Sequence, residues 1–333
     1  MATINDVCKA AGVSKATVSR VINGSPLVKE KTREAVLATM ESLGYQPNVL
    51  AQALATNSSN AIGIILPHFD SSYFGSILRK AAQEMKKANK QMFVMDSHNG
   101  IEGEIDAIQS LHKHRCDVII IYSRHLSEQQ LFELQEQINT PIIVLNRSFE
   151  NQSLYSFGFD QEQLARIAVE HLLELGHTKI ACLTNPMEGQ TGQRRLKAYR
   201  ETLNKHNIPY DESLVYDGFS LLQGGYDAAQ QLLDSKAEFT AILACNDDMA
   251  LGAIRALHER GVSVPQDISV IGIDDEPASR YSIPALSTVS LPIEKLTHDA
   301  MQLASFLLNK SKYQPENYDY FGTLVARESS HQL

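Results

Sequence analysis

The chain has 333 residues, of which 43% are hydrophobic and 21% charged, and its four cysteines lie far apart. This composition indicates a globular protein of two or three domains and excludes a disulfide-stapled secreted protein or a disordered chain. No segment approaches the roughly 20 apolar residues of a membrane span, and the N-terminus lacks a basic and apolar leader. We therefore expect a cytoplasmic protein with no membrane contact.

The net charge of −9 argues at first against a nucleic-acid partner, but the charge is unevenly distributed. Residues 1–59 carry six basic and four acidic side chains, whereas the remainder carries 24 basic and 35 acidic ones. A small basic segment joined to an acidic body is typical of a nucleic-acid-binding module.

The first 45 residues predict three short helices, over 4–11, 15–23 and about 29–43. Apolar side chains recur at helical spacing in each of them, and the third helix is expected to bury Val36, Met40 and Leu43. Ser14 is expected to cap the second helix. Two helices joined by a short turn with a glycine form the helix-turn-helix pattern.

The segment that follows, residues 46–60, predicts a short hinge helix and a polar linker. Asn48 can start this helix, and Leu50 and Leu54 give it an apolar side. About eight residues are fewer than the roughly 12–15 that an isolated helix needs for stability. We therefore expect it to be ordered only when another surface packs on it.

From residue 61 onward, short apolar runs alternate with amphipathic segments. The runs predicted as strands are 62–67, 91–97, 116–123, 141–148, 156–160, 179–184, 239–246 and 268–275. Apolar strands separated by helices predict parallel βαβ units with both faces covered. The simplest division is two Rossmann-like halves that hold a ligand at the carboxyl ends of their strands.

The N-terminal motif D-V-x-x-x-A-G-V-S-x-x-T-V-S-R-V-x-N begins at Asp6 and ends at Asn23. With segments 195–199, 246–253 and 270–275, it makes nearly the whole chain similar to the LacI/GalR family of bacterial transcription regulators. The resemblance implies an α/β protein with an N-terminal helix-turn-helix headpiece and two Rossmann-like subdomains of periplasmic-binding-protein type. The implied bounds are 1–45 for the headpiece, 46–60 for the hinge helix and linker, 61–157 with 291–320 for the N-subdomain, and 158–290 with 321–333 for the C-subdomain.

The second helix is expected to enter the major groove of DNA with Lys15, Ala16, Ser19 and Arg20. An arginine can form a bidentate bond with guanine, worth about 1–3 kcal/mol of discrimination. The resemblance also implies contacts to phosphates, which fix register without reading sequence. The residues concerned are Thr3, Ser14, Thr17, Asn23, Lys29, Thr32 and Tyr45. The alternatives are that the basic side chains are merely solvated and that Thr3 and Ser14 only cap helices.

Asn48 and Leu54 of the hinge helix complete the predicted DNA-binding set. The resemblance implies that Leu54 inserts into the minor groove at a central C-G step beside its dimer mate, which kinks the duplex. The alternative is that Leu54 only packs one hinge helix on the other. Val49 stands where some relatives carry a basic residue, a departure that weakens phosphate contacts there. We expect an isologous homodimer and a pseudo-palindromic double-stranded DNA operator.

A sugar needs polar groups for its hydroxyls, which reject the wrong sugar when left unpaired, and an aromatic wall for its C–H faces. The candidate ligand-binding residues are Asp70, Tyr73, Phe74, Asn146, Arg195, Phe219, Asn246 and Asp274. Tyr73 and Phe74 could instead be core residues. Asp247 or Asp248 is expected to cap the next helix, and Asp275 to brace the loop of Asp274. Residues 160–163 lack a glycine pair common in relatives, so this loop is expected to differ.

No nucleophile, zinc, P-loop or dinucleotide motif stands in a strand–helix context. Asp274 and Asp275 are neighbours on a strand and point to opposite faces, which disfavours an acid–base pair. We therefore expect no enzyme, no metal and no cofactor. The alternatives are a sugar receptor without DNA function, which the headpiece argues against, and a carbohydrate-active enzyme such as a sugar kinase, which the missing phosphate loop argues against.

The sequence thus predicts a sequence-specific repressor of carbohydrate-utilisation genes, controlled by a sugar effector bound between two subdomains. A change in their closure would alter the spacing of the hinge helices and so the affinity for the operator. The resemblance implies a β-glucoside-type effector first and galactose second. Whether the ligand releases or strengthens DNA binding stays open, as do the operator sequence and the regulated genes.

Overall fold

A computed structural model describes residues 2–23, 25–46, 59–98, 100–149, 154–185, 190–309 and 317–333. The chain forms two compact units, Met1–Asn60 and Ala61–Leu333. The predicted hinge helix, with Asn48, Val49 and Leu54, lies outside the described residues. No helix of the described segments is long and apolar enough to cross a membrane.

The first unit contains three helices, α1 (Ile4–Ala11), α2 (Lys15–Ile22) and α3 (Glu30–Ser42). Their inner faces form one apolar core of Val7, Val18, Val21, Val36 and Met40. Full burial of such a side chain contributes about 1.5–3 kcal/mol. The predicted helices are confirmed.

Leu43 is not buried, contrary to expectation. It follows the last residue of α3 and is 38% exposed. The chain turns after the helix at Gly44, whose φ of +57° favours glycine, and the next residue, Tyr45, packs back on this core. The interior side of α3 therefore ends at Met40.

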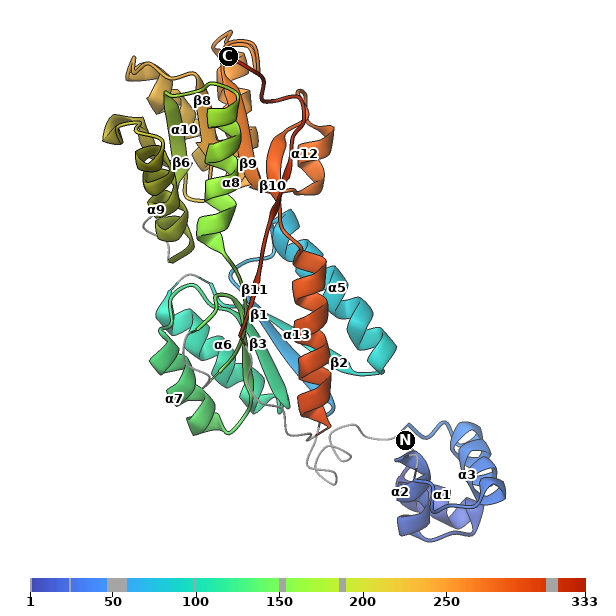
Figure 1. Cartoon of the computed structure of the whole chain (residues 1–333). Coiled ribbons are helices and arrows are strands. Elements are labelled where there is room, and N and C mark those ends of the chain that lie inside the picture. The colour runs from blue at the N-terminus through green and yellow to red at the C-terminus, as the bar shows by residue number, and fades with distance from the viewer. Residues whose placement is uncertain are drawn as a thin grey trace. The chain divides into compact units, whose positions relative to one another are not determined.

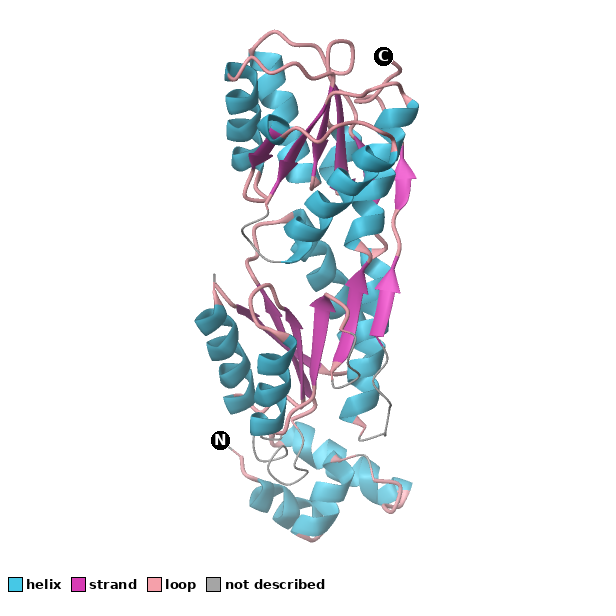
Figure 2. Cartoon of the chain, turned by 60° about the vertical axis from the view of Figure 1, so that its left-hand side comes forward, coloured by secondary structure: helices cyan, strands magenta, loops and turns pink. Residues whose placement is uncertain are grey.

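The larger unit contains two six-stranded sheets (Figures 1 and 2). We call the first sheet with its helices the first lobe, and the second sheet with its helices the second lobe. The first sheet is wholly parallel, in the order β11-β5-β4-β3-β1-β2. Its strands are β1 (Ala61–Leu66), β2 (Gln91–Asp96), β3 (Val118–Tyr122), β4 (Ile142–Asn146), β5 (Tyr155–Phe159) and β11 (Asn317–Tyr320). Its helices are α5 (Ser72–Ala88), α6 (Ile101–Lys113), α7 (Glu128–Ile138) and α13 (Ile293–Leu308).

Alternate residues of each buried strand face different helices, as the two-residue period of a strand requires. In β3, Ile119 and Ile121 belong to the apolar cluster of α6 and α7, while Ile120 and Tyr122 belong to that of α5 and α13. The edge strand β2 differs from the covered strand that was expected, because Phe93 and Val94 are more than a third exposed.

The second sheet has the order β12-β10-β9-β8-β6-β7, and only β12 is antiparallel. Its strands are β6 (Ile180–Thr184), β7 (Val215–Asp217), β8 (Ala241–Ala244), β9 (Ser269–Asp274), β10 (Ser287–Ser290) and β12 (Thr323–Val325). Its helices are α8 (Gln161–Glu174), α9 (Gln190–Lys205), α10 (Leu222–Asp234), α11 (Asp247–Glu259), the short α12 (Pro277–Tyr281) and the 3-10 turn η1 (Glu212–Leu214). Helix α8 packs on α9, and α10 packs on α11.

The chain crosses between the lobes after β5, after β10 and between β11 and β12 (Figure 1). At the first crossing, the amide side chain of Gln163 accepts a bond from Gly322 N at 3.0 Å and donates one to Gly322 O at 3.1 Å. A Cβ atom at Gly322 would lie 2.3 Å from Leu164 Cδ2, so only glycine fits there. Residues 160–163, expected to differ from relatives, thus tie two crossing segments together.

Candidate functional site

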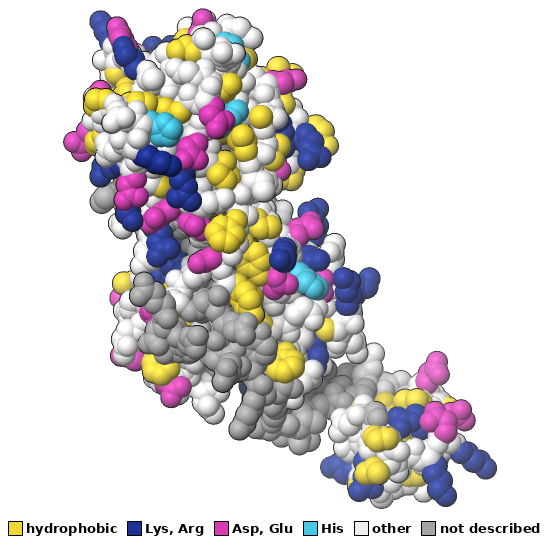
Figure 3. Space-filling view, viewed as in Figure 1, with side chains coloured by type: hydrophobic (Ala, Val, Ile, Leu, Met, Phe, Trp, Pro, Cys, Tyr) yellow, Lys and Arg dark blue, Asp and Glu magenta, His cyan; other side chains and the backbone are white. Residues whose placement is uncertain are grey.

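The outer face of α2 presents the side chains predicted to read DNA. Lys15, Ala16 and Arg20 are exposed, on the side opposite the buried Val18 and Val21. Figure 3 shows Lys and Arg side chains projecting from the surface of this unit. The arrangement leaves the basic groups free of the core, as a groove-binding helix requires.

The predicted phosphate contacts lie around this helix and also perform local structural roles. Ser14 Oγ accepts a bond from Thr17 N at 3.2 Å and bonds with Thr17 Oγ1 at 2.9 Å. Thr3 N and Thr3 Oγ1 both donate to the Asp6 carboxylate, and these bonds lower the pKa of Asp6. Of the other predicted phosphate contacts, the exposed ones are Asn23 and Lys29, and the half-buried ones are Thr17, Thr32 and Tyr45, while Ser19, predicted to face the groove, is also half-buried. Capping and phosphate contact are compatible for Ser14 and Thr3.

Between the two lobes lies a cavity that opens to solvent and has a volume of about 90 Å³. This is smaller than the roughly 300–1,000 Å³ of typical sites for small molecules. Six of the eight predicted ligand residues line it: Tyr73, Phe74, Asn146, Arg195, Asn246 and Asp274. They come from both lobes, and most lie at or just beyond the carboxyl end of a strand, where such sites occur.

Two predicted ligand residues do not line the cavity. Asp70 is exposed, and its carboxylate bonds with His68 Nδ1. Phe219 is 54% exposed in a loop where Phe219 and Ser220 both have a positive φ. The backbone of this loop turns the aromatic ring outward, which sequence spacing could not reveal.

Arg195 and Asp274 form the buried polar centre of the cavity. Their Nη2 and Oδ1 atoms lie 3.7 Å apart, and both side chains are less than a tenth exposed. Arg195 Nε donates to Gln161 Oε1 at 2.8 Å, and Arg195 Nη1 donates to the carbonyl of Cys245. Burial raises the pKa of Asp274 well above its ordinary value, although Arg195 opposes this shift. The pair offers both donors and an acceptor to a hydroxyl-bearing ligand.

Aromatic rings form a wall beside this centre. Tyr73, Phe74 and Tyr122 contact one another edge to face, with ring centroids 4.9 to 5.9 Å apart. Burial and the neighbouring Tyr122 raise the pKa of Tyr73, so its hydroxyl stays protonated and can donate. Phe74 belongs to the core, Tyr73 packs against it, and both line the cavity, so their contact with a ligand stays a prediction.

The helix cap at α11 was predicted wrongly. Asn246, and neither Asp247 nor Asp248, is the N-cap: its Oδ1 accepts from Met249 N at 2.9 Å. Asp247 turns inward instead, where it accepts bonds from Glu276 N, Ser279 Oγ and Thr288 Oγ1. Burial raises its pKa to about 6.

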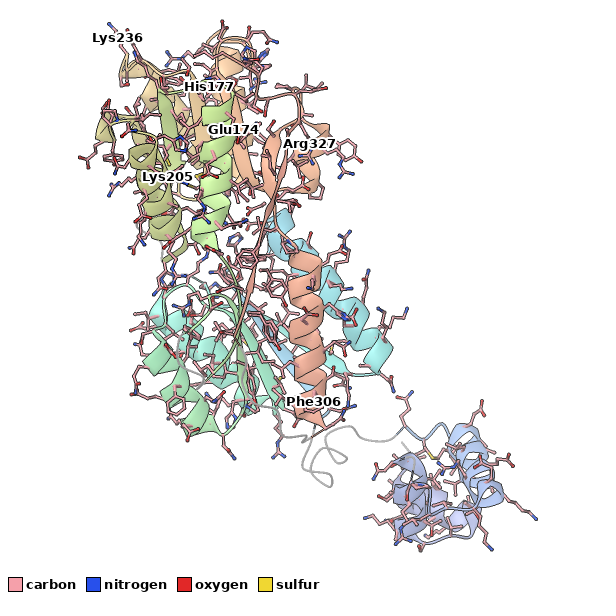
Figure 4. The ribbon with its side chains drawn as sticks, in the orientation of Figure 1. Glu174, His177, Lys205, Lys236, Phe306 and Arg327 are labelled. Atoms are coloured by element: carbon pink, nitrogen blue, oxygen red, sulfur yellow. The ribbon has the colours of Figure 1, made fainter. Side chains whose placement is uncertain are left out.

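Several cavity residues were not predicted: Gln161, Ser123, Arg124, Asn185, Thr191, Asp248 and Glu276. Ser123, Arg124 and Asn185 directly follow strands, and this position was an available signal. The positions of Gln161, Thr191 and Glu276 in the cavity wall depend on how two elements approach each other, which a sequence pattern does not reveal. The expected brace at Asp275 is present, since Arg327 forms an ion pair with it from the C-terminal segment (Figure 4).

Hydrogen bonds between described residues cross the cavity from one lobe to the other. Tyr73 N, in the first turn of α5, donates to Glu276 Oε1 at 3.1 Å. Thr191 Oγ1, in the first turn of α9, donates to Asn146 Oδ1 at 3.4 Å. Both contacts join the two lobes directly. Among the described residues, no group of three His, Cys, Asp or Glu side chains could hold a metal ion.

A helix-turn-helix unit with outward basic side chains and a two-lobed α/β unit with a polar cavity define a DNA-binding protein that responds to a small ligand. The protein-family model described as "Bacterial regulatory proteins, lacI family" matches residues 3–48. A second family model, "Periplasmic binding protein-like domain", matches residues 169–330. The transcriptional regulator AscG of Escherichia coli is 38% identical over 331 residues, 99% of this chain and 98% of that protein. The chain therefore belongs to the LacI family, whose members are DNA-binding transcriptional regulators with a sugar-binding domain and not enzymes.

Two solved structures share the fold. The lac repressor dimer bound to operator and the anti-inducer ONPF has a TM-score of 0.89 and 31% identity, with 99% of both chains covered. The complex of the transcriptional regulator CelR with cellobiose has a TM-score of 0.75 and 26% identity, with 99% of this chain and 100% of that one covered. The predicted family and fold class are confirmed.

Proposed function

We propose that the protein is a homodimeric repressor of carbohydrate-utilisation genes and that a β-glucoside-type sugar controls its affinity for a pseudo-palindromic operator. The observation that carries this proposal is the cavity, which joins the buried Arg195–Asp274 pair to an aromatic wall. Cellobiose in the CelR complex is a β-glucoside and supports this class of effector. A regulator of genes acts where the DNA is, which places the protein in the cytoplasm.

In this proposal, Arg195 donates to sugar hydroxyls, Asp274 accepts from them, and Tyr73 packs against a C–H face of the ring. Asn146 lies at the rim, where Thr191 contacts it. The side-chain oxygen of Asn246 accepts a hydrogen bond from Met249 N, and its amide nitrogen donates one to Ser220 O. The second proton of this amide can therefore be donated to a ligand. Asp70 and Phe219 would join only after their loops move inward.

On the DNA side, Lys15, Ala16, Ser19 and Arg20 read base edges, and the surrounding hydroxyls and Lys29 hold phosphates. Asn48 and Leu54 belong to the segment outside the described residues, and their roles are carried over from the family pattern. The dimer presents two such helices to the two half-sites.

The sugar acts by changing the closure of the two lobes. Closure makes or breaks the contacts Tyr73–Glu276 and Thr191–Asn146, which join the lobes directly. The hinge segments of the dimer follow this movement, so sugar and operator affinities are coupled. Such coupling between sites is typically about 1–3 kcal/mol.

Fluorescence anisotropy on labelled duplexes tests the proposal. One duplex is a palindrome with a central C-G step, and the control is a scrambled duplex at the same salt concentration, because phosphate contacts make affinity depend on salt. Cellobiose, salicin, arbutin and galactose are added in turn. We expect tighter binding to the palindrome and a change in that affinity with one β-glucoside.

Two results would contradict the proposal in different ways. A response to galactose alone would replace the β-glucoside with the galactose-type alternative and leave the rest intact. Equal weak binding to the palindrome, the scrambled duplex and genomic upstream fragments, unaffected by every sugar, would reject the regulator itself.

A further inference from the structure

Gln161 is the first residue of α8, directly after the chain has crossed from the first lobe to the second. Its side chain is 3% exposed and lines the cavity. Its Oε1 accepts a hydrogen bond from Arg195 Nε, and this links α8 to α9 at the cavity wall. A buried glutamine placed at this position needs an explanation, since burial of an amide costs free energy unless it is hydrogen-bonded.

The backbone around Gln161 is fixed from several sides. The side chain of Asp160 caps α8 by accepting from Gln163 N at 2.9 Å, and Asp160 N donates to Tyr320 O at 3.1 Å. Leu164, one turn later, is fully buried. The amide of Gln161 therefore presents its oxygen from an anchored helix terminus, which a loop residue could not do as accurately.

Arg195 has five N–H donors in a rigid plane. Gln161 takes the Nε–H and the carbonyl of Cys245 takes a donor of Nη1, so the plane of the guanidinium is set by two neutral acceptors. Nη2, which carries two further donors, then faces Asp274. Because both anchors are uncharged, they orient Arg195 without neutralising it, and its charge stays available to Asp274 and to a ligand.

We propose that Gln161 is a positioning residue that determines effector affinity and specificity by holding the guanidinium of Arg195 in the plane that the sugar meets. The inference rests on the proposed function, because it assumes that Arg195 contacts the sugar. Without this bond, Arg195 would sample several rotamers, and ordering them on binding would weaken affinity. Interactions of Asp274 and of the aromatic wall with the sugar would remain.

The variant Gln161→Met removes the polar atoms while nearly keeping the volume, and Gln161→Glu keeps the acceptor oxygen. Calorimetry with the β-glucoside that binds the full-length protein should show an affinity loss of about 10-fold for Gln161→Met, the scale of one hydrogen bond to a charged group. Gln161→Glu should restore part of the loss. Gln129→Met, on the exposed side of α7, is the matched control and should change nothing.

A double-mutant cycle with Arg195→Met separates positioning from simple damage to the fold. If Gln161 acts through Arg195, Gln161→Met adds no loss in the Arg195→Met background, while Gln129→Met leaves both sugar affinity and operator affinity unchanged. Equal losses from Gln161→Met in both backgrounds, or no rescue by Gln161→Glu, would overturn the inference. An Arg195→Met variant with unchanged sugar affinity would instead reject the proposed role of Arg195.

A measurement without sugar keeps the inference testable on its own. The Nε–H proton of Arg195 should be protected from solvent exchange in the nuclear magnetic resonance spectrum of the ligand-free protein, because Gln161 accepts it. The protected signal should vanish in Gln161→Met and persist in Gln129→Met. Persistence of the signal in Gln161→Met would overturn the inference whatever the sugar.

Discussion

The carboxylate of Glu276 accepts a hydrogen bond from the backbone N–H of Tyr73 across the cavity, 3.1 Å away. The acceptor lies in the second lobe, just after β9, and the donor lies in the first turn of α5 in the first lobe. A carboxylate near a helix N-terminus is favoured by the helix dipole. This bond therefore stabilises one particular closure of the lobes.

Closure should depend on pH through Glu276. Burial, with Asp248 and Asp247 nearby, raises its pKa to about 7 from an ordinary 4.5, and the bond from Tyr73 N opposes the shift. Glu276 therefore takes up a proton in this closed form when the pH falls through about 7, and if opening exposes Glu276 to water and lowers its pKa, acid favours closure. If the sugar binds the closed form, its affinity should rise as the pH falls from 8 to 6.

Calorimetry with the sugar across this pH range is the measurement for Glu276. Glu276→Gln keeps the acceptor oxygen but cannot titrate, so the pH dependence should largely disappear while binding persists. Asp247 lies inside the second lobe, bonded to Ser279 and Thr288. An unchanged pH profile in Glu276→Gln would assign the dependence to another group.

Substitutions on α2 should separate base reading from phosphate contact. Lys15→Ala or Arg20→Ala should reduce discrimination between operator variants by about 1–3 kcal/mol, because a bidentate contact to one base is lost. Ser14→Ala should weaken all duplexes alike and lower the free energy of unfolding of the first unit by about 1 kcal/mol, because a cap is lost. Anisotropy on a set of singly altered operators measures both effects, and Lys31→Ala on α3 is the charge-matched control.

Two glycine substitutions should change stability in opposite directions. Gly322→Ala places a Cβ atom 2.3 Å from Leu164 and 2.8 Å from Val289 where two crossing segments meet, and should destabilise the larger unit by about 1–3 kcal/mol. Gly75→Ala in α5 meets no atom within 4 Å and should stabilise it by up to about 1 kcal/mol. Urea denaturation of both variants tests this, and equal effects would contradict it.

Acid should loosen the C-terminal segment through His177, which lies beyond the end of α8 (Figure 4). Its Nδ1 bonds with Thr240 Oγ1 at 2.9 Å and its Nε2 with His331 O at 3.1 Å. Burial lowers its pKa below the ordinary 6.5, so the unfolded form binds a proton more readily and stability is lost as the pH falls below 6.5. The protection of residues 329–333 from hydrogen exchange, taken relative to the intrinsic exchange rate at each pH, should fall below that pH, and less so in His177→Gln.

Sequence patterns predicted the long helices and strands well, because the spacing of apolar residues along the sequence follows the periodic burial of these elements. The three headpiece helices and all eight predicted strands are present. Strands β7, β10, β11 and β12 were missed, since they have three or four residues each and little continuous apolar character. Such strands are recognised only through the neighbours with which they pair.

The residues of the candidate site likewise fall into those that a sequence pattern marks and those that only tertiary contacts bring to the cavity. Arg195, Asn246 and Asp274 were predicted because strand ends and the family pattern mark them. The roles of Gln161 and Glu276 depend on contacts between α8 and α9 and between the two lobes, which no local pattern encodes. Phe219 was placed in the cavity by pattern alone, and the positive φ of its loop turns it outward.

The strands β11 and β12 lie a few residues apart, yet β11 completes the edge of the first sheet and β12 that of the second. On the ribosome they are made after every other strand of the described segments. Until they emerge, both lobes have an open edge at once, so neither can finish folding ahead of the other. The ability to sense a ligand must therefore arise in one late step of synthesis, and a chain cut short before β11 should yield no half-functional sensor.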